Sequence, residues 1–258
     1  MTSVHQLFAL TRRIIKQNLT NADTIITVIA MPVFMLLFFV YVLGGNVVTT
    51  GGASAQAYLK YALPGFLLLT MAMGSAYTAL RINADQTSGF LSRLHSLPIR
   101  RWVILGSHVL ASVLFMVLAE AAVLAVGLLM GYRTHAHVGS LVGFIGISVL
   151  FGLAITLLAI PFSLKAKNYA SAGAFSYIIL MLLFVSSALM PTAGMAKPIR
   201  IFANHQPMTP IVNYARSLLG SVHVASGTGT TALLWLIGGS VVFAIASYVV
   251  YTHVYLKK

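Results

Sequence analysis

Long stretches without charged residues alternate with short basic segments along this chain. Charge-free stretches run over 24–59, 61–80, 134–164, 168–196 and 217–256, and the stretch 102–131 is interrupted only by Glu120. A helix needs about 20 apolar residues to cross the roughly 30 Å of hydrocarbon in a bilayer. The pattern therefore predicts six membrane-spanning helices, at about 25–43, 59–80, 102–131, 139–164, 170–190 and 232–252.

The fold class follows from this pattern together with the composition. The alternating pattern of membrane-barrel strands is absent, so we expect an all-α polytopic membrane protein, with residues 1–258 forming a single transmembrane domain. Hydrophobic residues make up 59% of the chain and charged ones 7%. A soluble domain has about 25% charged residues, and nucleic-acid binders carry their basic surface on a polar scaffold. Both classes are excluded, and no nucleic-acid partner is expected.

The positions of the basic residues predict the orientation. With six spans and a cytoplasmic N-terminus, the cytoplasmic side holds Arg12, Arg13, Lys16, Arg81, Arg93, Arg100, Arg101, Lys165, Lys167, Lys257 and Lys258. The other side holds Lys60, Arg133, Lys197, Arg200 and Arg216. Because cytoplasmic loops are enriched in Lys and Arg, we expect both termini in the cytoplasm and the protein in the cell membrane.

The first segment outside the spans is an amphipathic helix over residues 3–20. Its apolar arc holds Val4, Leu7, Phe8, Leu10, Ile14, Ile15 and Leu19, and its polar arc holds His5, Gln6, Arg12, Arg13, Lys16 and Gln17. Such a helix lies in the membrane interface, with its cations facing anionic headgroups of the bilayer. Asp23 is placed to act as the N-cap of the first span.

The predicted loop between spans two and three, RINADQTSGFLSRLHSLPIRR, contains a second amphipathic segment. Phe90, Leu91, Leu94 and Leu97 have the spacing of one helical face, Gly89 precedes them and Pro98 ends the segment. Arg93 and His95 point away from that face. Two interpretations remain open: the segment lies on the membrane, or it docks into a groove of a soluble partner.

The longest external segment, 191–231, contains four prolines and predicts two short apolar helices of re-entrant or interfacial type. In the second, Pro210 follows Thr209, which is placed to act as an N-cap.

Candidate chemistry is sparse. The chain has no G-x-x-x-x-G-K-[ST] motif, so it cannot bind nucleotide phosphates through a P-loop of its own. Its three carboxylates are far apart, it has no cysteine, and His135-x-His137 lacks a third metal ligand. We therefore expect no catalytic residue, no metal site and no bound cofactor.

Glu120 is the one acidic residue deep within a predicted span, where an acid faces protein or water. Three roles stay open: a hydrogen-bonded interhelical residue, a polar contact on a substrate path, or a proton-coupling site.

Taken together, these features are similar to a known family. The length, the six spans, the N-terminal interfacial helix and the segments SGFLSRLHSLPIRRW and FANHQPMTPIVNYARSLLGS resemble the permease subunit of ABC-2 type exporters, particularly the daunorubicin-resistance-like branch. One departure is that Asp85-Gln86-Thr87 stands where the family often has a Glu-Arg-Glu-like stretch.

The resemblance implies a function and partners. The chain would be the permease of an ATP-driven exporter of amphipathic drug-like or lipid-like substrates, with ATP and Mg bound by a separate dimeric ATPase. Two permease subunits, expected to be a homodimer, would form the pathway, with Glu120 as a candidate substrate-path residue. The segment between spans two and three would be the coupling helix, which contacts the ATPase through Asp85, Gly89, Phe90, Leu91, Arg93, Leu94, Leu97 and Pro98.

The residues alone also allow other classes of membrane protein. An ion-coupled secondary transporter could use Glu120 and His108, although the chain lacks the internal repeats of many such carriers. A membrane scaffold without transport is a further alternative.

Overall fold

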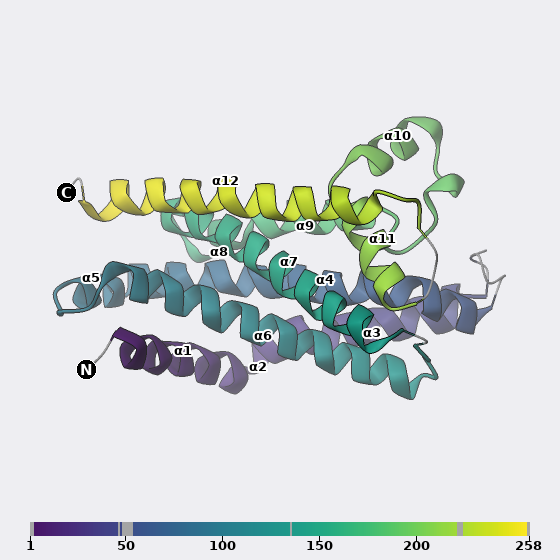
Figure 1. The fold of residues 1–258 in the computed structure, drawn as a ribbon. Coiled ribbons are helices and arrows are strands. Elements are labelled where there is room, and N and C mark those ends of the chain that lie inside the picture. Colours follow the sequence, from purple (N-terminus) through teal and green to yellow (C-terminus); the bar gives the residue numbers. More distant parts are fainter. Residues whose placement is uncertain (1–2, 46, 48–53, 135, 221–223, 257–258) are drawn as a thin grey trace.

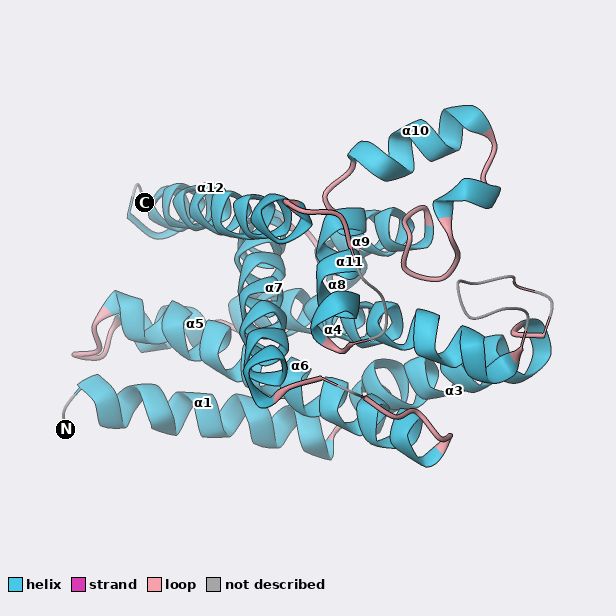
Figure 2. Ribbon diagram, turned by 45° about the vertical axis from the view of Figure 1, so that its right-hand side comes forward, coloured by secondary structure: helices cyan, strands magenta, loops and turns pink. Residues whose placement is uncertain are grey.

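The computed structural model describes residues 3–45, 47, 54–134, 136–220 and 224–256, and within these it contains helices and no strand (Figure 2). The predicted all-α class is thereby confirmed. His135, Lys257 and Lys258, which entered the sequence arguments, lie outside the described residues.

The elements follow one another as a series of long helices with short ones between. They are α1 (Ser3–Thr20), α2 (Ala22–Ile25), α3 (Met31–Phe38), α4 (Ala55–Thr87), α5 (Phe90–His95), α6 (Arg101–Leu129), α7 (Val138–Lys165), α8 (Tyr169–Gly173), α9 (Phe175–Phe184), α10 (Lys197–His205), α11 (Met208–Leu218) and α12 (Thr228–Leu256). Wide π turns at Ile26–Ala30 and Phe39–Leu43 flank α3. The first of these turns comes just before Pro32, which cannot donate a backbone hydrogen bond to the preceding turn.

Among the described residues, five helices are long and apolar enough to cross a membrane. They are Ala22–Leu43, Ala55–Thr87, Arg101–Leu129, Val138–Lys165 and Thr228–Tyr255, and each overlaps a predicted span. The sixth predicted span, 170–190, corresponds to a shorter apolar helix over Tyr169–Phe184, which α8 and α9 form. Six crossings therefore stay a prediction.

The helix α9 ends early because side chains replace its next turn. The Ser186 hydroxyl donates to the carbonyl of Leu183 at 2.6 Å, and the Gln206 amide donates to the carbonyl of Leu182 at 2.8 Å. These bonds satisfy carbonyl groups that a longer helix would have satisfied with its own backbone. Gln206 comes from the segment between α10 and α11, so hydropathy could not predict this end.

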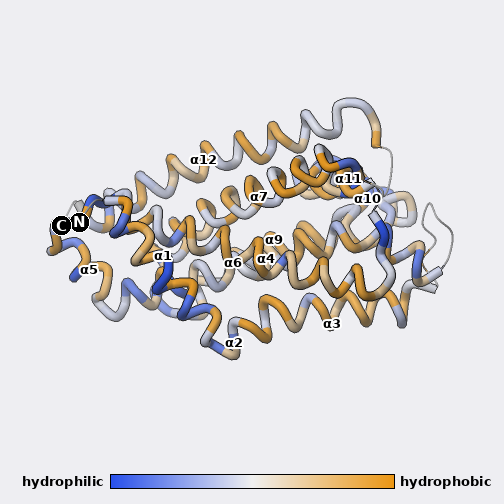
Figure 3. Tube along the Cα trace, turned by 60° about the horizontal axis from the view of Figure 1, so that its bottom comes forward, coloured by the Kyte–Doolittle hydropathy of each residue, from blue (hydrophilic) through white to orange (hydrophobic). Residues whose placement is uncertain are grey.

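The helices define two ends of the molecule. Both α5 and the last turns of α12 lie at one end, here called the α5 end, whereas α10 and α11 lie at the other, the α11 end (Figure 1). Between α7, which finishes at the α5 end, and α12, which begins at the α11 end, the chain returns along α8 and α9. Hydrophobic residues dominate the middle of the long helices, and hydrophilic residues gather near the two ends (Figure 3).

The helix α4 is the centre of the bundle. From Tyr58 to Ala72 every residue except Lys60 is buried, as expected for a helix that is apolar on all sides. Gly65 is required there because a Cβ atom would clash with the carbonyl group of Ala188 in the turn after α9. This close approach brings the turn after α9 directly against α4.

The predicted amphipathic helix over 3–20 is present as α1, but its apolar residues divide between two surfaces. Ile14 is buried with Thr11 and Asn18 in the packing of α1 along α6. Val4 and Phe8 are more than half exposed. The helix thus has one face on the protein and a second apolar face pointing outward, next to its basic residues.

Two predicted helix caps are wrong. Asn21, not Asp23, caps the first span, because its side-chain oxygen accepts from the Thr24 amide at 3.2 Å. Asp23 instead accepts a 2.7 Å hydrogen bond from the Tyr77 hydroxyl. Thr209 lies inside α11, which begins at Met208, and its hydroxyl donates to the carbonyl of Ala203. In both places another polar group competes for the predicted cap residue.

Candidate functional site

The short helix α5 is positioned by a reversal of the chain after α4. Gly89 stands at its start with φ of +73°, a left-handed conformation that glycine adopts without strain. Leu91 and Leu94 are buried in one cluster with Ile104 of α6, and Leu10 of α1 packs against the same cluster. The apolar face of α5 is therefore covered by its own chain.

This packing changes which predicted coupling residues face outward. Leu97, predicted to share the face of Leu91 and Leu94, lies beyond the last helical residue and is 52% exposed. Arg93 and Pro98 are exposed as well, whereas Phe90 and Gly89 are half-buried. The outward surface at α5 thus consists of Arg93, Leu97 and Pro98 with neighbouring serines. Contact with an ATPase stays a prediction.

Asp85, the remaining predicted coupling residue, is buried at the end of α4. Its carboxylate accepts two hydrogen bonds, of 3.0 and 3.1 Å, from the Arg13 guanidinium of α1. Nε2 of His108 on α6 lies 3.6 Å from the same carboxylate. The Arg13 guanidinium also lies over the Phe90 ring, 3.8 Å from its centroid. Asp85 therefore joins α1 to the α4–α5 corner.

His95 attaches α5 to the last span on the other side. Its Nε2 lies 2.6 Å from the Tyr251 hydroxyl, and its ring stacks on Tyr255 with centroids 4.5 Å apart. Both tyrosines belong to α12. The helix α5 is thus held by α1 through charge and by α12 through aromatic and hydrogen-bonded contacts. The sequence analysis noted His95 only as pointing away from the apolar face.

Glu120 lies in the middle of α6 and is 4% exposed. Its carboxylate accepts a 2.9 Å hydrogen bond from the Ser148 hydroxyl of α7. The structure therefore shows an interhelical hydrogen bond, one of the three predicted roles. A role in a substrate path stays a prediction, and Glu120 does not line the cavity described next.

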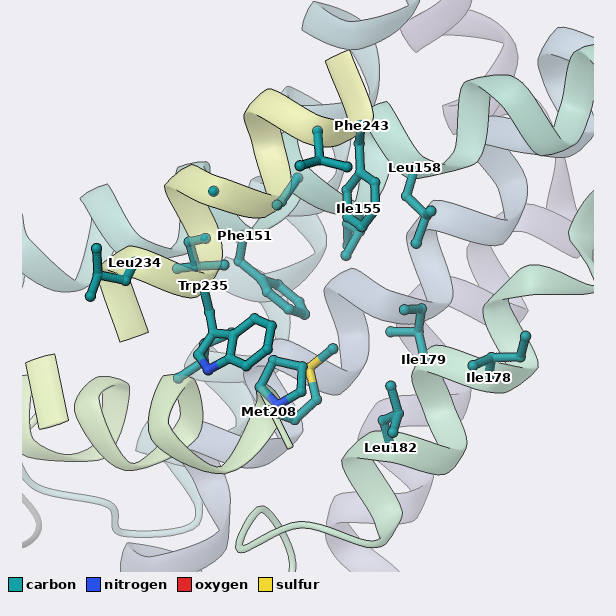
Figure 4. A pocket seen from close by; sticks show the side chains of 17 residues that line it. Phe151, Ile155, Leu158, Ile178, Ile179, Leu182, Met208, Leu234, Trp235 and Phe243 are labelled. Atoms are coloured by element: carbon teal, nitrogen blue, oxygen red, sulfur yellow. The ribbon is translucent and has the colours of Figure 1, made fainter. Parts of the chain in front are cut away.

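An apolar cavity of about 650 Å³ lies between α7, α9, α11 and α12. Its walls include Phe151 and Ile155 of α7, Ile179 and Leu182 of α9, Met208 of α11 and Trp235 of α12 (Figure 4). No lining residue is charged, and the volume lies within the roughly 300–1,000 Å³ of small-molecule sites. The cavity can accept an apolar group of drug size.

The cavity reaches the outer surface of the bundle. Its lining residues Ile178 of α9 and Leu234 of α12 are 58% and 69% exposed. Gly238 and Gly239 contribute no side chains to its α12 wall, and a Cβ on Gly238 would meet nothing within 4 Å. The sequence analysis missed this cavity; the adjacent glycines within a predicted span were its only local signal.

Arg216 is a buried cation at the α11 end without a carboxylate partner. Its Nε donates to the carbonyl of Tyr61 at 2.9 Å, and its Nη2 donates to the carbonyl of Ser187 at 2.7 Å. Its Nη1 donates to the side chain of Asn213, also at 2.7 Å. Burial lowers the pKa of the Arg216 guanidinium, although electrostatic interaction with the Tyr61 side chain partly offsets this effect. The guanidinium carbon also lies 3.9 Å from the centroid of the Tyr61 ring.

These bonds connect α11 to α4 and to the turn after α9. Met208 and Ile211 of the same helix line the apolar cavity. By fixing the position of α11, Arg216 therefore also fixes one wall of that cavity. From the sequence, Arg216 counted only as one of the external basic residues.

Arg216→Met is expected to destabilise the protein by roughly 2–4 kcal/mol, because it leaves buried carbonyl groups without donors. Arg200→Met, at an exposed position of α10 at the same end, is the matched control and should change stability by less than about 0.5 kcal/mol. Thermal unfolding in detergent measures both. Equal thermal unfolding midpoints for the two variants would show that the buried Arg216 guanidinium does not stabilise the fold.

Comparison with known proteins identifies relatives over most of the chain. Residues 5–219 match the family described as ABC-2 type transporter. A daunorubicin resistance ABC transporter permease protein from Streptomyces coeruleorubidus is 26% identical over 223 residues, which cover 86% of this chain and 76% of the relative. A protein from Mycobacterium tuberculosis with the name "probable doxorubicin resistance ABC transporter permease protein" is 24% identical over 243 residues, 94% of this chain and 86% of the relative.

Proposed function

Since this chain belongs to the ABC-2 type transporter family and is the membrane subunit of an ABC exporter, we propose that it moves amphipathic drug-like or lipid-like molecules out across the cell membrane. The observation that carries the substrate class is the uncharged cavity of about 650 Å³ that reaches the surface between α9 and α12. The two relatives named for daunorubicin and doxorubicin resistance support the same class.

The energy would come from a separate ATPase dimer that binds ATP and Mg. The chain has no P-loop motif, and its family implies association with such a subunit. The outward surface formed by Arg93, Leu97 and Pro98 at α5 would contact the ATPase. Because α5 is bonded to α1 and to α12, movement of the ATPase would reach both helices. Two copies of the chain, as a homodimer, would form the pathway.

The α5 end would then be cytoplasmic. Nine of the basic residues that the structure describes belong to helices at that end or to the connections next to them: Arg12, Arg13, Lys16, Arg81, Arg93, Arg100, Arg101, Lys165 and Lys167. This excess agrees with the enrichment of cations in cytoplasmic segments. In this arrangement α8 and α9, with the turn after them, form the fifth of six crossings, and α10 and α11 lie at the external side.

The substrate would reach the cavity from the bilayer. In the hydrophobic band, the gap between α9 and α12 faces lipid chains, so an amphipathic molecule can move sideways from the membrane to the walls formed by Met208 and Trp235. Motion of α12, transmitted from α5 through His95, would change the width of this gap. Movement of α12, driven by the ATPase, would thus open or close the access of the substrate to the cavity.

Ion-coupled transport through Glu120 and His108 has less support. The two residues are twelve positions apart on α6, about 18 Å along a helix, so they cannot exchange a proton directly. Each already has a protein partner, Ser148 for Glu120 and the Asp85 carboxylate near His108.

The ATPase contact can be tested with the double variant Arg93→Glu, Leu97→Asp. Both side chains are exposed, so the thermal unfolding midpoint should stay unchanged while co-purification of the ATPase is lost. The matched control is Arg133→Glu, Leu129→Asp at the α11 end, where both side chains are also exposed. Full co-purification with the α5 variant would disprove the contact.

The cavity can be tested with Gly238→Leu, which places a side chain into the open space of the α12 wall. We expect ATP-driven daunorubicin uptake into inverted vesicles to fall by about tenfold or more, because a leucine side chain fills part of the site. The ATPase should still co-purify. Gly146→Leu on α7, also with open space around it, is the control. Unchanged uptake by Gly238→Leu would remove the cavity from the substrate path.

A further inference from the structure

A second groove, of about 320 Å³, lies at the α5 end between the start of α6, α7 and the last turns of α12. It shares no lining residue with the cavity described above and lies on the α5 side of it, where its lining on α12 begins at Ala244, next to Phe243 of the cavity. Among its lining residues are Arg101, Trp102, Leu105 and Val109 of α6 and Tyr248 and Thr252 of α12. These residues are not used by the transport proposal.

The lining changes from polar to apolar along the helix axis. Arg101 is the first residue of α6 at the α5 end, and Leu105 and Val109 follow one and two helical turns deeper. Eight residues separate Arg101 from Val109, which corresponds to about 12 Å along a helix. On the wall formed by α12, the polar Thr252 lies nearer the α5 end and the apolar Ala244 lies deeper, as on the α6 wall. This order is complementary to a ligand with an anionic head and an apolar tail.

Each Asp and Glu side chain has another partner, so none is available to neutralise Arg101. The chain has three acidic side chains: Asp85 binds Arg13, Asp23 binds Tyr77, and Glu120 binds Ser148 deep in the bundle. Arg100, the residue before α6, is exposed and adds a second positive charge, and it supplies no side-chain cap to the helix. The positive end of the helix dipole adds to this local potential.

The aromatic residues of the groove place its mouth at the membrane interface. Trp102 is 51% exposed and Tyr248 is 69% exposed, and both ring types gather at the level of lipid headgroups. A soluble anion could use Arg101 but would leave the apolar depth of the groove empty. A phospholipid supplies both a phosphate for the guanidinium and a chain for the apolar walls.

We propose that this groove binds one anionic phospholipid, with its phosphate on Arg101 and an acyl chain along Leu105 and Val109. The bound lipid also contacts Tyr251, which lines the groove and is hydrogen-bonded to His95 of α5. The site therefore lies against the attachment between α5 and α12. It does not depend on the identity of the transported substrate.

The chain contains only two tryptophans, and each lines a different pocket: Trp102 lines this groove and Trp235 lines the apolar cavity. In the variant Trp235→Phe, fluorescence reports the groove alone. The full-length variant is reconstituted in vesicles that contain phosphatidylglycerol or phosphatidylcholine with brominated chains, which quench a nearby indole. We expect phosphatidylglycerol to quench Trp102 at a roughly fivefold lower mole fraction than phosphatidylcholine does.

Two matched pairs of substitutions locate the effect. Arg101→Gln should abolish the preference for phosphatidylglycerol, whereas Arg100→Gln, at a neighbouring exposed residue outside the groove lining, should retain most of it. Ala244→Phe fills the groove and should reduce quenching, whereas Val241→Phe, on α12 outside the lining, should not. Thermal unfolding midpoints establish that each variant is folded.

Three results would overturn the proposal. The first is equal quenching by the two lipids, and the second is an equal loss of preference in Arg100→Gln and Arg101→Gln, which would indicate general surface charge. The third is displacement of phosphatidylglycerol by inorganic phosphate at millimolar concentration, which would show that a soluble anion occupies Arg101.

Discussion

The hydrogen-bonded ion pair between Asp85 and Arg13 is the interaction on which the α5 end depends. A chain with only three carboxylates uses each of them between two elements: Asp85 joins α4 to α1, Asp23 joins the first span to α4, and Glu120 joins α6 to α7. Asp85 and Glu120 are buried, so each needs a partner within the protein, whereas Asp23 is exposed. Each acidic residue thereby connects two helices.

The cations follow the opposite rule, because most of them have no acidic partner. With sixteen Lys and Arg against three Asp and Glu, the excess must lie at the membrane interfaces or find neutral acceptors. Arg216 finds neutral acceptors, the backbone carbonyls, one of which belongs to Ser187 in the turn after α9. Arg101 lies at the interface, at the mouth of a groove whose deeper part is apolar. Because cations outnumber acids, Arg216 is left to bond backbone carbonyls at the α11 end, and Arg101 is left to bind a lipid phosphate at the α5 end.

The sequence predicts helix positions well and helix surroundings poorly. The 3.6-residue period located α1 at residues 3–20, but it could not separate Ile14, which packs on protein, from Phe8, which points outward. Both surroundings are apolar, so hydropathy gives the same signal for each. For the same reason, the apolar spacing of Leu91 and Leu94 allowed a membrane-facing or a docking segment, and hydropathy could not predict that the two side chains pack against Ile104 of the same chain.

Features that depend on distant residues were outside the reach of sequence patterns. Gln206 bonds the end of α9 and Arg216 bonds the turn after it, and both act across the fold without a local mark in the sequence. The sequence predicted Asp23 as the cap of the first span, and the geometry instead selects Asn21. The family resemblance, by contrast, rested on segments spread over nearly the whole chain and is confirmed.

The central claim is that the α4–α5 corner moves α1 through Asp85 of α4 and Arg13 of α1. The most direct measurement compares ATP-driven transport of the proposed amphipathic substrate by Asp85→Asn, Arg13→Gln and the double variant, in complexes that still hold the proposed ATPase. If the two side chains act as one link, each single substitution lowers transport, and the double variant is no worse than the more impaired single variant. Losses that multiply in the double variant, or single variants that transport at the wild-type rate, would contradict the claim.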